Sequence, residues 1–199
     1  MKQEEKNKKS REHITACAFA EFAAQGYLGA SINAICASGQ ISKGLLYHYY
    51  TDKDALYLTC VAQCFQELTG YLASHLDAET VTPDQYFDVR LVFFREHPLH
   101  QRLFCDTVVN PQPHLKEQIS ACRKSFDDLN EILLTAILQK ERLAAGVSIQ
   151  DAIWQLRLLE DFINTYLKNS DQETRQPEEH DRLCRQTLHT MLYGLIDQS

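Results

Sequence analysis

The sequence has few of the residues that mark turns. Seven glycines and five prolines are spread over 199 residues. This sparseness disfavours a β-sandwich, whose short strands need frequent turns, and it favours long helices. No apolar run approaches the ~20 residues that span a bilayer, so no membrane partner is predicted. The charged N-terminus has no apolar stretch before a cleavage site, so we expect no secretory signal.

The sequence also lacks a surplus of positive charge. It has 20 Lys and Arg against 27 Asp and Glu, a net charge of -7. Because DNA phosphates attract basic surfaces, this balance argues against a nucleic-acid partner for the chain as a whole. The acidity lies after residue 54, however, since residues 1–54 hold seven Lys or Arg against six Asp or Glu. DNA binding in this first segment would need local basic contacts and would weaken steeply with salt.

The cysteines, the histidines and the short motifs of the sequence give no support for a disulfide framework, a metal site or catalysis. Seven cysteines without framework spacing predict reduced thiols in a cytoplasmic protein. Cys60 and Cys64 lie one helical turn apart, which favours two small buried thiols over a redox pair. His97, His100 and Cys105 match no standard zinc spacing. With no phosphate loop or nucleophile elbow, we expect no enzyme, no catalytic or metal-ligating residues and no cofactor.

Helical periodicity, in contrast, runs through the whole chain. After a polar arm at residues 2–11, Ile14, Ala18 and Phe22 recur at helical spacing, and Gly26 is a candidate C-cap. Two short helices follow, capped by Ser31 and Ser42. Longer helices are predicted at about 53–76, 83–97, 99–109, 114–145, 148–169 and 177–197. We therefore predict an all-α fold of about nine helices: an N-terminal three-helix unit and a C-terminal helical bundle.

The three-helix unit has the parts of a helix-turn-helix. A tight turn at residues 38–40 separates its second and third helices. A recognition helix of this kind fits the major groove, and helix N-termini point backbone N–H groups at phosphates. Hydrogen-bond donors gather around the third helix: Lys43, Tyr47, His48, Tyr49 and Lys53.

Residues 14–57 resemble the DNA-binding domain of the TetR-family transcription regulators. The matching positions are Phe22, Gly26-Tyr27, Ser31-Ile32, Ile35, Ile41-Ser42-Lys43-Gly44, Leu46-Tyr47, Lys53 and Leu56. The resemblance implies a TetR-like fold with a DNA-binding domain at 1–52, including the arm, and a helical ligand-sensing and dimerisation domain at 53–199.

The same resemblance implies roles for individual residues. Tyr47 and Lys53 would grip phosphates, assisted by Ser31, Ser42 and Tyr49. The residues nearest the base edges would be Lys43, Gly44, Leu45 and His48.

The sequence departs from the family pattern at three positions. Gln40 stands where the family has a turn glycine, so either Gln40 adopts a positive φ or Gly39 takes over that geometry. Cys36 replaces an alanine. Tyr50 replaces a phenylalanine, and its hydroxyl needs a partner or solvent.

The helix predicted at 148–169 is apolar around nearly its whole circumference. Its one narrow polar stripe consists of Arg157, Asp161, Asn164 and Lys168. Such a helix must be covered on more than one side. Together with the final predicted helix it would form a four-helix interface between two copies, in agreement with the dimers of the resembled family. The alternative is one thick intramolecular core.

Candidate ligand contacts lie on a second helix. Tyr86, Arg90, Phe93 and His97 combine aromatic surface with polar ends, which is typical both of ligand sites and of a boundary between core and solvent. Phe104, Phe126 and Trp154 are candidates to complete a cavity. Glu160 lies on the apolar arc of its helix, and a buried carboxylate needs a partner: a cationic ligand, Arg90 or a residue of a second copy.

These features predict a cytoplasmic, homodimeric regulator of transcription. Its two recognition helices would occupy successive major grooves of a pseudo-palindromic operator. An unidentified small-molecule effector would shift the helix predicted at 53–76 and release the DNA. Repression is what the resemblance implies. The alternative is a helical ligand-binding or adaptor protein whose N-terminal unit no longer binds DNA.

Overall fold

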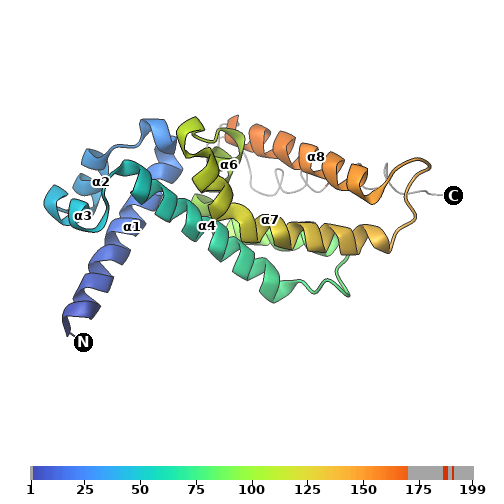
Figure 1. The fold of residues 1–199 in the computed structure, drawn as a ribbon, viewed down its shortest axis with the longest axis horizontal. Helices are drawn as coiled ribbons and strands as arrows, with labels where there is room; N and C mark the ends of the chain where they lie inside the picture. The colour runs from blue at the N-terminus through green and yellow to red at the C-terminus, as the bar shows by residue number, and fades with distance from the viewer. Residues whose placement is uncertain (1, 170–185, 188–189, 191–199) are drawn as a thin grey trace. The chain divides into compact units, whose positions relative to one another are not determined.

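The computed structural model describes residues 2–169, 186–187 and 190. The elements, coloured along the chain in Figure 1, are α1 (Lys2–Gly29), α2 (Ile32–Gly39), α3 (Lys43–Tyr49), α4 (Lys53–His75), α5 (Pro83–Glu96), α6 (Pro98–Val109), the 3-10 turn η1 (Pro113–Leu115), α7 (Lys116–Gln139) and α8 (Ile149–Asn169). The all-α prediction is confirmed. None of these helices is long and apolar enough to cross a membrane. The helix predicted at 177–197 lies almost entirely outside the described residues.

Side-chain caps fix where several helices begin. The Oγ atoms of Ser31 and Ser42 accept the backbone N–H three residues later, at 3.1 and 3.2 Å. Asp52 caps α4 in the same way at 2.8 Å. Thr82 and Gln85 form a reciprocal capping box at the start of α5. Because each cap satisfies a donor that has no intrahelical partner, the predicted helix starts are confirmed here.

The N-terminal polar arm was predicted wrongly, because these residues are helical. The helix α1 begins at Lys2 and is interrupted only at Gly26, where φ is 65°. Ion pairs of four-residue spacing join Glu5 to Lys9 at 3.0 Å and Lys8 to Glu12 at 3.9 Å. Such pairs stabilise the first turns of α1, which are solvated and have no apolar face of their own.

The helix α7 ends at Gln139, earlier than predicted. Its end is set by tertiary contacts of the next residues. Lys140 donates through Nζ to three carbonyl oxygens between Ala78 and Val81, at 2.7–3.3 Å. Leu143 and Val147 then pack against the neighbouring core, so the residues between Gln139 and Gly146, which were predicted to be helical, form a packed loop.

The chain divides into two compact units. The first comprises Met1–Phe65 and Leu99–Arg123, and the second comprises Gln66–Pro98 and Lys124–Ser199. The boundary crosses α4 and α7, so both helices contribute residues to each unit. The functional division predicted between residues 52 and 53 is a separate matter and stays a prediction.

Each unit has its own apolar core. The predicted stripe of α1 is fully buried in the first unit, as are Ile35, Leu46 and Leu56. The core of the second unit draws on α5, α7 and α8, through Tyr86, Phe87, Leu133, Leu134, Ile137, Leu138, Ala152, Ile153 and Leu156. Burial of such side chains contributes about 1.5–3 kcal/mol each, which is enough to fix the packing of short helices.

The turn between α2 and α3 resolves the alternatives at Gln40. This residue itself adopts the left-handed conformation, with φ 52° and ψ 40°. Gly39 is required for a different reason: a Cβ there would lie 2.5 Å from Cδ1 of Ile41 and 2.7 Å from Sγ of Cys17. The close packing of the turn therefore needs glycine at 39, while the backbone strain falls on 40.

Substitutions at these two neighbours should have opposite effects. Left-handed backbone costs a non-glycine residue about 1–2 kcal/mol, and glycine loses about 0.5–1 kcal/mol in unfolded-chain entropy. Gln40→Gly should therefore raise the free energy of unfolding by about 0.5–1 kcal/mol, whereas Gly39→Ala should lower it by about 1–3 kcal/mol through overpacking. Urea unfolding measures both. Gln40→Ala is the control, and equal stability of Gln40→Gly and Gln40→Ala would contradict the assignment of strain.

Candidate DNA-binding surface and buried polar cluster

The helix α3 has one buried residue, and its other residues are exposed apart from Tyr49, which is partly buried. Leu46 is fully buried, and Ile41 and Tyr50, which flank the helix, are buried beside it. The residues that were predicted to lie nearest the DNA are all exposed: Lys43, Gly44, Leu45, Tyr47 and His48. A Cβ placed on Gly44 would meet nothing within 4 Å, so the backbone is open to close approach at this point.

The tyrosines at the end of α3 have different environments. Tyr50 is buried, and its hydroxyl lies 2.7 Å from Oγ1 of Thr15. Thr15 donates to the carbonyl of Arg11, so Tyr50 is the donor of this bond, and its hydroxyl has the partner that burial requires. Tyr47 is half exposed and its hydroxyl is accessible. Only the second kind of tyrosine can reach a phosphate.

Two serines at helix starts share this open surface. Ser31 and Ser42 are exposed, and each Oγ accepts one backbone N–H. A hydroxyl that accepts a bond still has its own proton to donate. Both serines can therefore cap their helices and donate to an anion at the same time.

Lys53, at the start of α4, is held by an aromatic ring. Its Nζ lies 4.4 Å from the ring centroid of Tyr27, within cation–π range. The hydroxyl of Tyr27 donates to Asp54, which also lies 3.2 Å from Nε2 of His114. Burial and the neighbouring Asp54 raise the pKa of Tyr27 to about 12, so the phenol keeps its proton and remains a donor. This network has no signal in the sequence, because it joins residues far apart in the chain.

A polar cluster lies inside the second unit, where three helices meet. Arg90 of α5 donates through Nη1 to the carboxylate of Glu160 on α8. The same nitrogen donates to the hydroxyl of Tyr86 at 2.9 Å. That hydroxyl lies 2.9 Å from Oδ1 of Asn130 on α7 and 3.2 Å from Oε1 of Glu160. Of the three partners considered for Glu160, Arg90 contacts it in the structure.

The two charges of the cluster neutralise each other and are nearly buried. The side chains of Arg90 and Glu160 are 10% and 14% exposed. Burial opposes the charge on Arg90, but Glu160 and Tyr86 outweigh that effect and raise the pKa of the guanidinium. Burial raises the pKa of Tyr86, which therefore acts as a neutral hydrogen-bonding group. Asn130 was missed in the sequence, although its place between Phe126 and Leu133–Leu134 on the core face of α7 was a signal.

The other predicted ligand contacts are distributed differently. Phe126 lies beside the cluster, with its ring centroid 5.7 Å from the guanidinium of Arg90. Phe93 is buried against Tyr71 and the His97 ring. Phe104 packs on Phe65 within the first unit. The indole of Trp154 is 62% exposed, so it is not part of a buried wall.

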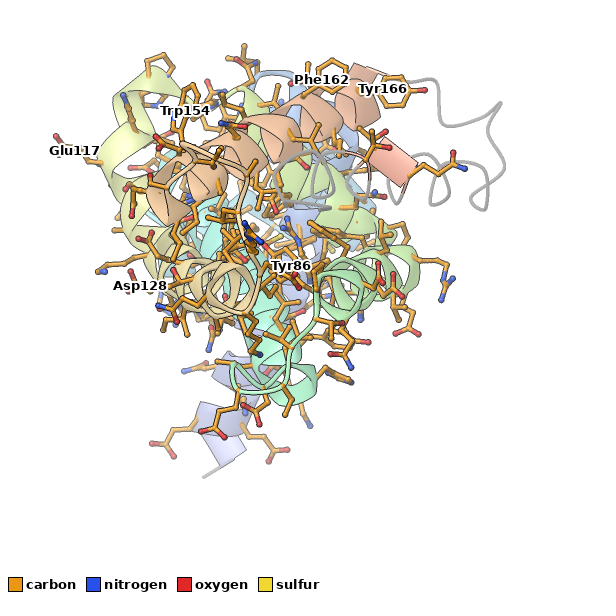
Figure 2. All side chains as sticks on the ribbon, turned by 90° about the vertical axis from the view of Figure 1, so that its right-hand side faces the viewer. Tyr86, Glu117, Asp128, Trp154, Phe162 and Tyr166 are labelled. Carbon is orange, nitrogen blue, oxygen red and sulfur yellow. The ribbon has the colours of Figure 1, made fainter. Side chains whose placement is uncertain are left out.

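The outer face of α8 is unusually apolar. Trp154, Leu158 and Phe162 recur at four-residue spacing and are 48–65% exposed. Figure 2 shows Trp154 and Phe162 projecting from the same side of the helix as Tyr166, with Tyr86 on its other side. The predicted polar stripe is thus divided: Arg157 and Asp161 are exposed, whereas Asn164 is buried. We call Trp154, Leu158 and Phe162 the α8 outer stripe.

The cysteines and histidines that were weighed as reactive sites lie in the packed interior or against aromatic rings. Cys60 and Cys64 are fully buried, and burial raises the pKa of Cys60 to about 12. The ring of His100 lies 4.6 Å from that of Phe19. Among the described residues, no three His, Cys, Asp or Glu side chains gather in a group that could hold a metal ion.

Comparisons with known proteins show similarity in sequence for the part of the chain that contains α2 and α3. Residues 14–60 match the family of bacterial regulatory proteins, tetR family. The HTH-type transcriptional regulator RutR of Escherichia coli is 24% identical over 136 residues, which cover 67% of this chain. The alignment spans 64% of RutR, just under two thirds of its length.

Solved structures extend the likeness in fold to nearly the whole chain. The fatty acid degradation regulator FadR of Bacillus halodurans has a TM-score of 0.72 at 15% identity, and covers 93% of this chain and 99% of its own. FadR of Bacillus subtilis, in complex with stearoyl-CoA, has the same TM-score and coverage at 14% identity. The fold and the exposed α2–α3 surface are those of a helix-turn-helix protein. Residues 14–60 match the tetR family of bacterial regulatory proteins, and the chain shares its fold with FadR.

The buried pair gives a stability prediction. Removing one member of a buried ion pair leaves an unpaired charge and costs about 3–5 kcal/mol, whereas replacing both with apolar residues is often neutral. Glu160→Leu should therefore lower the free energy of unfolding by about 3–5 kcal/mol, and Arg90→Met with Glu160→Leu should recover most of the loss.

Urea unfolding at one protein concentration tests this prediction. The matched control is Glu131→Leu, which breaks the exposed pair between Arg157 and Glu131 (2.8 Å) and should cost about 1 kcal/mol or less. A double variant as unstable as the single one would show that Arg90 and Glu160 do not stabilise each other.

Proposed function

We propose that the protein is a transcription regulator that binds operator DNA through α2 and α3. The observation that carries the proposal is the match of residues 14–60 to a family of DNA-binding regulators, combined with the exposure of every base-facing candidate on α3. This activity requires no catalytic residue and no cofactor, and its natural compartment is the cytoplasm. Repression follows from the family and from no single residue.

The proposed DNA contacts are of two kinds, to phosphates and to base edges. Tyr47 and Lys53 bind phosphates, and the hydroxyls of Ser31 and Ser42 supply further donors. Tyr49 assists when its hydroxyl exchanges Oδ1 of Asn7, 3.4 Å away, for a phosphate oxygen. Lys43 and His48 face the base edges, where the openness at Gly44 allows a close approach, and Leu45 offers apolar contact to a thymine methyl group. Two copies of this surface read a pseudo-palindromic operator.

The second unit senses a small-molecule effector at the polar cluster. Arg90 and Glu160 are a buried charged pair in the core of that unit, and such pairs are candidates for ligand recognition because a bound polar group can replace one partner. The FadR relative that carries stearoyl-CoA supports an effector for this fold. A compound that both raises the Tm and releases DNA would identify the effector. If no screened compound class does both, sensing loses its support.

The helix α4 is the route from effector to DNA. It begins with Lys53, and in its second half Tyr71 packs on Phe93 of α5, with ring centroids 5.2 Å apart. The same α5 helix carries Tyr86 and Arg90. An effector that binds the two states with different affinity would move α5 and, with it, α4.

The protein is a homodimer through α8 and the final predicted helix. The α8 outer stripe supports this assignment because an apolar row with exposed Trp and Phe side chains is typical of a covered interface. A symmetric dimer also supplies the two recognition helices that the operator requires.

Substitutions on α3 test DNA binding. Lys43→Ala should weaken operator binding by about tenfold or more, with less effect on random duplex DNA, because a base contact contributes about 1–3 kcal/mol. Tyr47→Phe should weaken binding to both, because it removes a hydrogen bond to a charged phosphate. Both side chains are exposed, so helical circular dichroism should not change.

Fluorescence anisotropy with a duplex selected from a random library by the wild-type protein provides the measurement. Lys124→Ala, an exposed lysine that pairs with Asp128, is the control and should bind as wild type. Normal binding by both α3 variants would refute the contact assignment. If no duplex is ever selected, the chain is a ligand-binding or adaptor protein.

The α8 outer stripe should control the oligomeric state. Phe162→Glu places a charge in the middle of the proposed interface, where burial without a partner is unfavourable. Light scattering should then give the mass of one chain instead of two. Ile132→Glu, at a 57% exposed position on α7, is the matched control and should remain dimeric. A wild-type protein that is monomeric at all concentrations would exclude this interface.

A further inference from the structure

The first three turns of α1 precede the part of the chain that matches the family. The helix begins at Lys2, and the match begins at residue 14. Twelve helical residues extend about 18 Å at a rise of about 1.5 Å per residue. In Figure 1 these turns, in dark blue, project past α2 and α3. We call residues 2–13 the α1 extension.

Contacts hold the α1 extension against both ends of α3. At the C-terminal end of that helix, the hydroxyl of Tyr49 donates to Oδ1 of Asn7 at 3.4 Å. Arg11 donates to the hydroxyl of Tyr50 at 3.5 Å, and its guanidinium lies over the same ring. At the turn before α3, Nε2 of His13 donates to the carbonyl of Gly39 at 2.8 Å. The extension is therefore fixed relative to the recognition helix.

One face of the extension is basic and accessible. Lys6, Lys9, Ser10 and His13 line a shallow surface depression together with Glu5. Lys9 pairs with Glu5 at 3.0 Å, and the two side chains are 73% and 65% exposed. An exposed pair of this kind contributes about 1 kcal/mol or less, so Lys9 can exchange the carboxylate for a phosphate at little cost. Lys6 is exposed beside it.

We propose that this face is a second DNA contact, in which Lys6 and Lys9 bind backbone phosphates that flank the base pairs read by α3. The inference rests on the proposed function, since it needs α3 in the major groove. The extension is long enough to follow about five base pairs at ~3.4 Å each. Because the helix is already formed and attached, binding does not pay for ordering a loose arm. The contact also places positive charge at the DNA in a chain whose net charge is -7.

The test compares two duplexes that share one selected operator. One ends at the outermost base pairs read by α3, and the other continues for six base pairs on each side. Wild-type protein should bind the longer duplex at least about tenfold more tightly at low salt, with a steeper salt dependence. Each lost phosphate contact lowers the log–log slope by about 0.9, so two contacts per protomer, four per dimer, account for about 3.6.

The variant Lys6→Ala with Lys9→Ala should bind both duplexes alike, and its slope should equal that of wild type on the short duplex. Alanine favours helix at exposed positions, so the extension should stay folded. The charge-matched control is Lys8→Ala with Lys124→Ala. It removes the same two charges away from this face and should keep the full preference for the longer duplex.

The outcomes separate this inference from the proposed function. If an operator is selected but flanking DNA helps wild type and the Lys6/Lys9 variant equally, the second contact is refuted while DNA binding stands. An equal loss in the charge-matched control would attribute the effect to net charge and refute it too. If no operator is selected, the proposed function fails and this inference fails with it.

Discussion

The burial of one charge, the guanidinium of Arg90, organises the second unit. An isolated ion in a protein interior costs several kcal/mol, so Arg90 must find a counter-charge and further acceptors. It finds Glu160 on α8 and the hydroxyl of Tyr86, which is bonded in turn to Asn130 on α7. Three helices are thereby fixed in register by polar contacts that apolar packing alone would not specify. Such a site is rigid while its charges and hydrogen bonds are paired. It can change conformation when a ligand replaces one of the partners.

The first unit differs, because the function proposed for it needs polar groups that stay outside the core. The helix α3 is only seven residues long and is too short to be stable by itself. Leu46 anchors it, Ser42 caps it, and the close-packed turn at Gly39 fixes its start. These few contacts stabilise α3, so its remaining surface is available for the proposed contact with DNA. The strain at Gln40 is the visible cost of that compactness.

The helix α4 contributes residues to both units. Its first residue, Lys53, lies over the ring of Tyr27 in the first unit, and Tyr71 packs with α5 in the second. A continuous helix has its backbone hydrogen bonds satisfied internally and bends sharply only at particular residues or bulges. Within the proposed function, that continuity gives a physical basis for coupling effector and DNA.

Features that depend on near neighbours in the chain could be predicted from the sequence. Helix starts at Ser31, Ser42 and Asp52 follow from a side chain and an N–H three residues apart, and the buried stripe of α1 follows from helical spacing. The dense pattern at 14–57 predicted the family match at residues 14–60 for the same reason. Only the tertiary structure decided the partner of Glu160, the end of α7 at Gln139 and the helical state of residues 2–11. It also turned Trp154 outward and buried Asn164. These outcomes depend on which distant residues meet, and helical periodicity contains no information about that.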